Sequence, residues 1–167
     1  QAPVPVIAAV RGYCLGGGNE INVACDLTLA AESAIFGQVG PTVGSAPIFG
    51  GAQFLPGSVG EKRAREIIFL CQRYSAGEAE RFGWCNKVVP DDRFDTELKG
   101  WTDRILELSP QSLRVSKLSL NYVSDWQYGS FNGAVEMLIA MNGTDEFREG
   151  MSAFLEKRKP EFQRLRR

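Results

Sequence analysis

The chain has 167 residues, of which 44% are hydrophobic and 23% are charged, and its formal net charge at pH 7 is -1. These values are ordinary for one globular domain or part of one. A charge this close to zero does not indicate a nucleic-acid partner, and no apolar run approaches the length of a membrane span.

The sequence contains no histidine. This excludes Ser-His-Asp and Cys-His catalytic arrangements and makes a mixed zinc site improbable. Acid–base chemistry in this chain must therefore use carboxylates, lysine, tyrosine, cysteine or backbone groups.

The four cysteines are Cys14, Cys25, Cys71 and Cys85, and each lies in an apolar stretch. They form no C-x-x-C pair, and none has an evident basic neighbour in the sequence. The pattern predicts buried, reduced thiols, as expected for a cytoplasmic protein.

The most informative stretch is near the start, at residues 5–20. Val6 to Val10 reads as a buried strand, Gly12 to Gly18 as a glycine-rich turn, and a helix follows from Asn19. Glycines before a helix let an anion approach free N–H groups at the helix start. The stretch lacks a dinucleotide fingerprint and a P-loop. Two interpretations remain: an oxyanion site with Glu20 one turn into the helix, or a turn whose glycines serve packing only.

Three further strands are predicted at residues 26–31, 34–37 and 86–89. Four short strands make a thin sheet for this much helix, so we expect the chain to be the C-terminal part of a larger fold. Between them, residues 38–51 form a loop rich in glycine, proline and serine, and a loop of this length is often functional.

Helices are predicted from capping signals and apolar periodicity. Ser75 and Glu78 fit a capping box, and Gly83 is expected to end the helix that follows. Asp92 is expected to cap the next helix, and Ser109, which is followed by proline, to cap the one after it. The expected helices cover residues 60–71, 75–82, 94–108, 110–120, 130–142 and 145–158.

The amino-acid sequence of three stretches resembles that of the crotonase (enoyl-CoA hydratase/isomerase) superfamily. They are residues 6–20 (VIAAVRGYCLGGGNE), residues 25–27 (CDL) and residues 34–38 (AIFGQ). The resemblance implies an α/β fold, the spiral ββα crotonase fold with a C-terminal helical region, whose N-terminal part this chain lacks. It divides the chain into core residues 1–92 and a helical region, 93–167, for a lid and trimerisation.

The resemblance also implies the chemistry. Crotonase-type enzymes stabilise an enolate-like oxyanion of an acyl-CoA thioester with two backbone N–H groups. One of them corresponds to Gly17, and the other belongs to the missing N-terminal part. Glu20 matches the first of two catalytic glutamates, and Gly16 matches a glycine that contacts the substrate. No metal or redox cofactor is implied, since coenzyme A is part of the substrate.

The second catalytic glutamate of hydratases would lie two residues after Gln38, where this chain has Gly40. Glycine here, followed by Gly44 and Ser45, resembles the subgroup that acts on cyclic substrates. Two members of that subgroup carry an aspartate where this chain has Pro47. Retained Glu20 with Gly40 and Pro47 is most similar to the 6-oxocyclohex-1-ene-1-carbonyl-CoA hydrolases, and glycine at position 40 would leave room for a ring or a second water.

The resemblance therefore implies a hydrolase that adds water to a cyclic β-oxoacyl-CoA and opens its ring in aromatic compound degradation. Lys157 and Phe162 would contact coenzyme A, on the same or on a neighbouring subunit, and Ser45 would contact the acyl part. The protein would form a trimer or a dimer of trimers (a hexamer). Three alternatives stay open: a linear enoyl-CoA hydratase or isomerase, a dihydroxynaphthoyl-CoA synthase-like enzyme, and an RNA-binding homologue.

Overall fold

The computed structural model describes residues 2–166, and its first sheet is parallel. The strands are β1 (Ile7–Val10), β3 (Leu27–Ala31) and β6 (Lys87–Val89), in the order β1-β3-β6. Ala30 of the central strand lies between Val10 and Val88 in register. The three predicted strands at residues 6–10, 26–31 and 86–89 are thus confirmed, and they are neighbours.

A second three-stranded sheet was not predicted as a separate unit. It contains β2 (Tyr13–Leu15), β4 (Ile35–Gly37) and β5 (Arg73–Ser75), with β2 parallel and β5 antiparallel to β4. The prediction of one thin sheet is therefore wrong, and the predicted glycine turn contains strand β2. Strands of three residues carry little periodicity, so their partners in the fold decide whether they form.

Four helices pack around the two sheets: α1 (Gly17–Ala24), α2 (Gly51–Val59), α3 (Glu61–Leu70) and α4 (Ala76–Arg81). The capping box at the start of α4 is confirmed, because Ser75 and Glu78 bond reciprocally. Helix α2 was not predicted, since Pro56 lies inside it and glycines stand at both its ends. It forms because Leu55 is completely buried in the core.

The core lies between the sheets and these helices. Phe36, Leu55, Ile67 and Trp84 belong to one cluster, in which the Phe36 and Trp84 rings lie 5.5 Å apart. A smaller cluster joins Leu29, Ala31 and Val89 of the parallel sheet to Phe94. The first helix after the predicted boundary at residue 92 is thereby packed onto the sheet.

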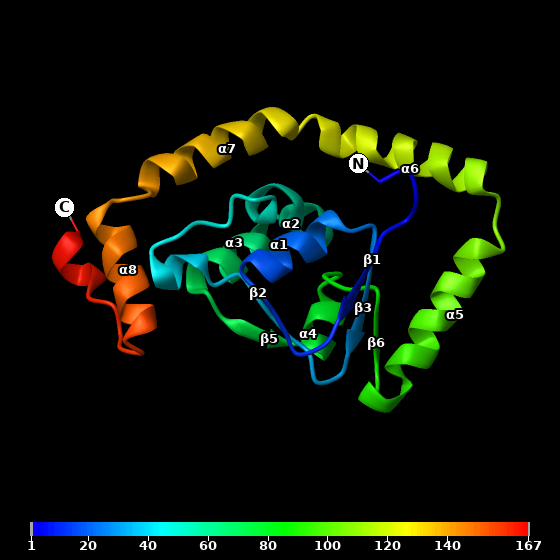
Figure 1. The fold of residues 1–167 in the computed structure, drawn as a ribbon, viewed down its shortest axis with the longest axis horizontal. Coiled ribbons are helices and arrows are strands. Elements are labelled where there is room, and N and C mark those ends of the chain that lie inside the picture. The colour runs from blue at the N-terminus through cyan, green and yellow to red at the C-terminus, as the bar shows by residue number, and fades with distance from the viewer. Residues whose placement is uncertain (1, 167) are drawn as a thin grey trace.

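The remaining helices form an arc around the core, as Figure 1 shows. They are α5 (Phe94–Leu106), α6 (Pro110–Asp125), α7 (Tyr128–Met141) and α8 (Asp145–Leu155). Ser109 caps α6 as predicted. Asp92 does not cap α5, because a 3-10 turn, η2 (Asp91–Arg93), precedes that helix. None of the helices within residues 2–166 combines the length and apolar character needed to cross a bilayer.

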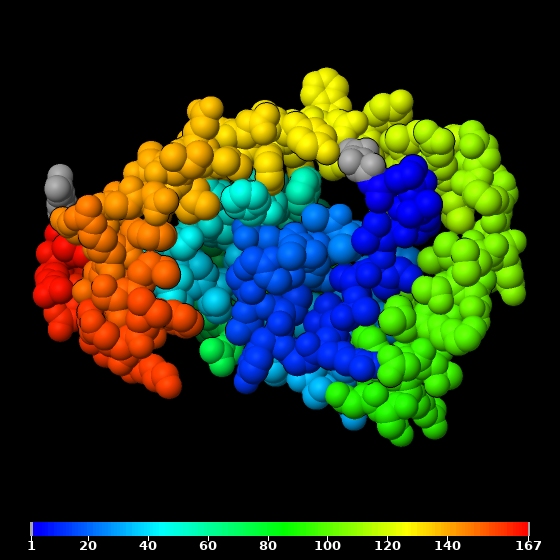
Figure 2. All heavy atoms as spheres, viewed as in Figure 1, coloured from blue at the N-terminus to red at the C-terminus, as the bar shows by residue number. Residues whose placement is uncertain are grey.

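The arc contacts the rest of the fold at α6 and at α8. On α6, the Lys117 ammonium donates to the Val4 carbonyl oxygen at 2.8 Å, and in Figure 2 the N-terminal segment reaches the arc. Further along, α8 packs on a 3-10 turn, η1 (Gly40–Val43), where Gly150 meets the backbone of Val43.

Glu149 on α8 holds the C-terminal segment in place. Its carboxylate is almost completely buried and pairs with Arg158 at 2.6 Å and with Arg164 at 3.3 Å. It also accepts the Glu161 N–H at 2.9 Å. The Arg158 hydrogen bonds, followed by the Glu161 N–H, lower the pKa of Glu149 from 4.5 to about 2.

Replacement of Glu149 by glutamine should destabilise the full-length protein at pH 7. A lowered pKa in the folded state stabilises the fold above the ordinary carboxyl pKa, and this stability is lost as the pH falls towards about 2. Denaturant melts of wild type and Glu149→Gln should therefore differ most at neutral pH and converge in acid. Asp145→Asn is the control on the same helix, since its pair with Arg148 is exposed. If the difference in unfolding free energy between wild type and Glu149→Gln stayed the same in acid, this role of Glu149 would be contradicted.

Candidate functional site

The site is built on the first turn of α1. Gly16 precedes the helix with φ 53°, a left-handed value that favours glycine, and its N–H donates to the Gly37 carbonyl at 3.1 Å. Gly17 occupies the first helical position, and its N–H has no hydrogen-bond partner within residues 2–166. Gly17 and Glu20 lie three residues apart, so they share one side of the helix. An exposed donor and a carboxylate therefore stand together.

The Glu20 carboxylate faces the start of α2. Its Oε1 accepts the Phe49 N–H at 2.8 Å. Burial raises the pKa of Glu20, while hydrogen bonds from the N–H groups of Phe49 and Gly51 act in the opposite direction. No second carboxylate of residues 2–166 contributes to this shift of the pKa. Glu20 is thus a half-buried acid, with a pKa above its ordinary value, held at a helix start that favours its charge.

The predicted functional loop, residues 38–51, begins and ends beside this first turn. At its start, Gln38 bonds to Asn19 of α1, and at its end Gly51 lies against Glu20. A β-carbon on Gly51 would lie 3.1 Å from both Glu20 Cγ and Pro47 Cβ. Pro47 is therefore an apolar neighbour of Glu20. Two members of the cyclic-substrate subgroup carry an aspartate at this position.

Gly40 and Ser45 lie together within the loop, where the Ser45 N–H donates to the Gly40 carbonyl at 3.0 Å. The expected open space at position 40 is not there. A β-carbon on Gly40 would lie only 3.3 Å from the Ser45 carbonyl oxygen, because the loop folds back on itself. Glycine at this position allows the backbone of residues 45–46 to come close.

A buried hydrogen-bonded group behind the site was missed by the sequence analysis. Asn19 donates from Nδ2 to Gln38 Oε1 at 2.8 Å, and its Oδ1 accepts the Trp84 Nε1–H at 2.7 Å. All three side chains are buried. The available signal was an amide residue in each of two short motifs, Asn19 in GGGNE and Gln38 in FGQ.

Lys157 and Phe162 lie beyond α8, and no contact within residues 2–166 brings them to Glu20. Lys157 is exposed, with a φ of 54°. The neighbouring Arg158 is paired with Glu149 and Glu156. Contact of Lys157 and Phe162 with coenzyme A stays a prediction.

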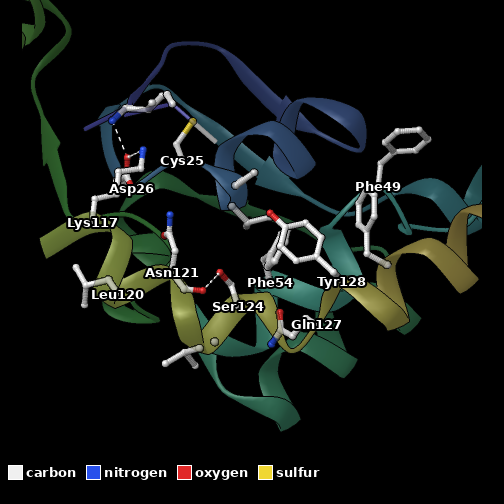
Figure 3. Close-up of a pocket in the computed structure, with 17 residues that line it drawn as sticks. Cys25, Asp26, Phe49, Phe54, Lys117, Leu120, Asn121, Ser124, Gln127 and Tyr128 are labelled. Carbon is white, nitrogen blue, oxygen red and sulfur yellow. Dashed lines mark hydrogen bonds and ion pairs between the residues drawn. The ribbon is translucent and has the colours of Figure 1, made fainter. Parts of the chain in front are cut away.

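A cavity of about 620 Å³ lies between helices α1 and α2 on one side and α6 and α7 on the other. Figure 3 shows Phe49 and Phe54 among its apolar lining, with Asn121 and Ser124 on α6 and Gln127 just before α7. The Phe49 and Phe131 rings meet edge to face, with centroids 6.0 Å apart. Glu20 does not line the cavity, but Phe49 connects the two, since its N–H binds Glu20 while its ring lines the cavity.

Of the four cysteines, only Cys25 lines the cavity. Cys14 and Cys85 are buried as predicted, whereas Cys25 and Cys71 are only half-buried. Burial raises the pKa of both Cys14 and Cys85 to about 12, which disfavours the reactive thiolate. Within residues 2–166, no three histidine, cysteine, aspartate or glutamate side chains gather in a group that could hold a metal ion.

Comparison with known proteins gives consistent matches. A family model described as enoyl-CoA hydratase/isomerase matches residues 1–165. Carnitinyl-CoA hydratase from Mycobacterium avium is 30% identical with a TM-score of 0.92, and the match covers 98% of this chain and 64% of that one. An enoyl-CoA hydratase from Mycobacterium avium subsp. paratuberculosis K-10 is 30% identical with a TM-score of 0.88, and the match covers 96% of this chain and 65% of that one. An enoyl-CoA hydratase from Bacillus anthracis is 34% identical with a TM-score of 0.73, and the match covers 96% of this chain and 63% of that one. This chain spans less than two thirds of the length of each.

Replacement of Gly51 by alanine should displace the Glu20 side chain, because the new methyl group would press on Glu20 Cγ and on Pro47. In the full-length protein, we expect hydrogen exchange at the Phe49 amide to accelerate as its bond to Glu20 lengthens. Gly57→Ala is the matched control, since a β-carbon there meets no atom within 4 Å. It should gain up to about 1 kcal/mol of stability from helix propensity and leave Phe49 unchanged. Equal exchange at Phe49 in both variants would contradict the contact.

Proposed function

Because this chain belongs to the enoyl-CoA hydratase/isomerase family, we propose that the protein processes an acyl-CoA thioester, with Glu20 as acid–base group and the Gly17 N–H as an oxyanion donor. The similarity to solved structures also establishes the expected α/β crotonase fold with its C-terminal helices. The second oxyanion donor of the family lies, in this proposal, outside residues 1–167.

The observation that carries the proposal is the Gly17–Glu20 pair. An N–H group that no residue within 2–166 uses is placed before reaction, so it can bind negative charge as it develops on a thioester oxygen. The Glu20 carboxylate, on the same side of α1, has a raised pKa and accepts two backbone N–H groups. A carboxyl group tuned in this way can take a proton from water and return it to carbon.

We propose water addition as the shared first step. Glu20 removes a proton from water, and the water oxygen bonds to the β-carbon of a conjugated double bond. The π electrons move to the thioester oxygen, which Gly17 stabilises, and a proton returned to the α-carbon completes the hydration. In a β-oxo ring, a second water attacks the ring ketone and the bond from that carbon to the α-carbon breaks. The electron pair of this bond passes into the thioester enolate, and the α-carbon then takes the proton released by the second water, which leaves an open-chain carboxylate.

We propose a cyclic β-oxoacyl-CoA, similar to 6-oxocyclohex-1-ene-1-carbonyl-CoA, as the substrate. Two positions support this: Gly40, where hydratases of the family carry their second glutamate, and buried Pro47 beside Glu20. The cavity beyond Phe49 offers apolar space of a size usual for small ligands. A second candidate is hydration of linear enoyl-CoA, which is favoured by the names of the similar hydratases.

The deciding experiment offers the full-length protein three thioesters in ¹⁸O-labelled water and measures product masses. The thioesters are 6-oxocyclohex-1-ene-1-carbonyl-CoA, 2-oxocyclohexane-1-carbonyl-CoA and crotonyl-CoA. We expect two waters gained on the first substrate and turnover reduced about 100- to 10,000-fold in Glu20→Gln, because acid–base catalysis contributes that much. As a base, Glu20 must be ionised, so activity should fall in acid at a pH above the usual glutamate pKa.

Other outcomes would overturn parts of the proposal. One water gained on crotonyl-CoA alone would replace the ring-opening substrate with a linear one. Full activity in Glu20→Gln would remove Glu20 from the mechanism. Glu136→Gln, an exposed glutamate on α7, is the control and should keep wild-type activity.

We further propose that the protein assembles as a trimer or a dimer of trimers through the arc of helices. Large apolar side chains on the arc are exposed, among them Leu120, Val123, Trp126, Met137 and Ile139. Trp126 is 90% exposed, which is unusual for a tryptophan unless a partner covers it.

Charge placed in this surface should weaken the assembly. For Trp126→Glu in the full-length protein, we expect light scattering to give a smaller mass than for wild type. Glu61→Lys changes the charge on exposed α3, away from the arc, and should leave the mass unchanged. A monomeric wild type, or a Trp126→Glu variant of unchanged mass, would contradict this interface.

A further inference from the structure

The start of α1 has no local means of holding its position. The residue before the helix, Gly16, supplies no side-chain cap, and the first two helical residues are glycines, which are poor helix formers. The helix is only eight residues long, too short to be stable by itself. The geometry of Gly17 and Glu20 must therefore be set by tertiary contacts.

Asn19 supplies the most specific of these contacts. It lies between Gly17 and Glu20, its exposure is 0%, and both ends of its amide are bonded. Gln38 follows strand β4, and Trp84 is held by ring contacts with Phe36 and Tyr74. A side chain bonded at both ends to two different elements resists rotation and sliding of the first helical turn.

The direction of Asn19 also determines where Glu20 can lie. Successive residues of an α-helix are about 100° apart around its axis. With Asn19 directed into the core, Glu20 is turned towards Phe49 and Gly51, the residues whose N–H groups it accepts. Gly16 adds an anchor one turn earlier through the Gly37 carbonyl, next to Gln38.

From this arrangement we infer that Asn19 is a positioning residue, which acts through Gln38 and Trp84 to hold the Gly17 N–H and the Glu20 carboxylate in their reactive places. The inference rests on the proposed function. Displacement of a reacting group by about 1 Å can cost about 100-fold in rate, so a looser first turn should affect turnover more than substrate binding.

The chain offers a matched control in Asn22. It is also a buried asparagine on α1, and it accepts the Thr28 hydroxyl at 2.8 Å. It lies one turn further along, at the opposite end of the helix from Gly17. Loss of either asparagine removes a buried hydrogen bond, but only loss of Asn19 frees the reactive turn.

The test compares Asn19→Leu, Asn22→Leu and Glu20→Gln in the full-length protein, with whichever thioester the wild type turns over. For Asn19→Leu we expect kcat to fall about 10- to 100-fold while KM changes less than about threefold. The acid limb of the pH profile should also move to lower pH, because water that reaches Glu20 removes the cause of its raised pKa. Asn22→Leu should lower the melting temperature by less, because Asn22 makes one such bond and its Nδ2 has no partner within residues 2–166, and it should leave kcat and the pH profile unchanged.

A result in which Asn19→Leu and Asn22→Leu share wild-type kcat and the same acid limb would overturn the inference. If Asn19→Leu does not fold, Trp84→Phe serves instead, since it removes the Nε1–H donor and keeps a smaller aromatic ring in the core. It should lower kcat about three- to tenfold with the same direction of pH shift, and wild-type values would overturn the inference. Full activity of Glu20→Gln would instead refute the proposed function, so the two failures are distinguishable.

Discussion

The structure around the site depends on one buried amide, that of Asn19. It joins three segments that are far apart in the sequence: the start of α1, the residue after β4 and the connection between α4 and β6. Such a group must be bonded at both ends, because an unpaired amide in a low-dielectric interior is strongly unfavourable. The requirement ties the two sheets to the helix that carries Gly17 and Glu20. It also brings the loop of residues 38–51 alongside that helix.

The ionisation of Glu20 reflects two opposed effects. Burial favours its neutral form, whereas the N–H groups at the start of α2 favour its charged form. Helix α2 is therefore part of the site, although its sequence, with Pro56 and flanking glycines, resembles a loop. The ring of Pro47 lies near Glu20, and the backbone of residues 45–46 packs closely against Gly40. No second carboxylate of residues 2–166 contributes to the raised pKa of Glu20.

The C-terminal helices have a different character from the core. They pass around it as an arc that contacts the core through Lys117 of α6, which pairs with Asp26, and through α8, where Gly150 meets the backbone of Val43. Between these attachments, α6 and α7 keep many apolar side chains exposed. A cavity remains between the arc and the helices of the core. This is an arrangement suited to further contacts, both with a ligand and with another chain.

The sequence alone determined the features that depend on neighbouring residues. These include the parallel strands around Val10, Ala30 and Val88, the caps at Ser75 and Ser109, and the family to which the glycine-rich stretch belongs. Such features follow from local periodicity and from hydrogen bonds between residues close in the chain. Only the tertiary structure decided the division into two sheets, the helix at residues 51–59 and the filled space at Gly40. It alone also decided the partners of Asn19 and Glu20. These depend on contacts between distant segments, which no local pattern specifies, because the free energy of a short strand or helix comes mainly from what it packs against.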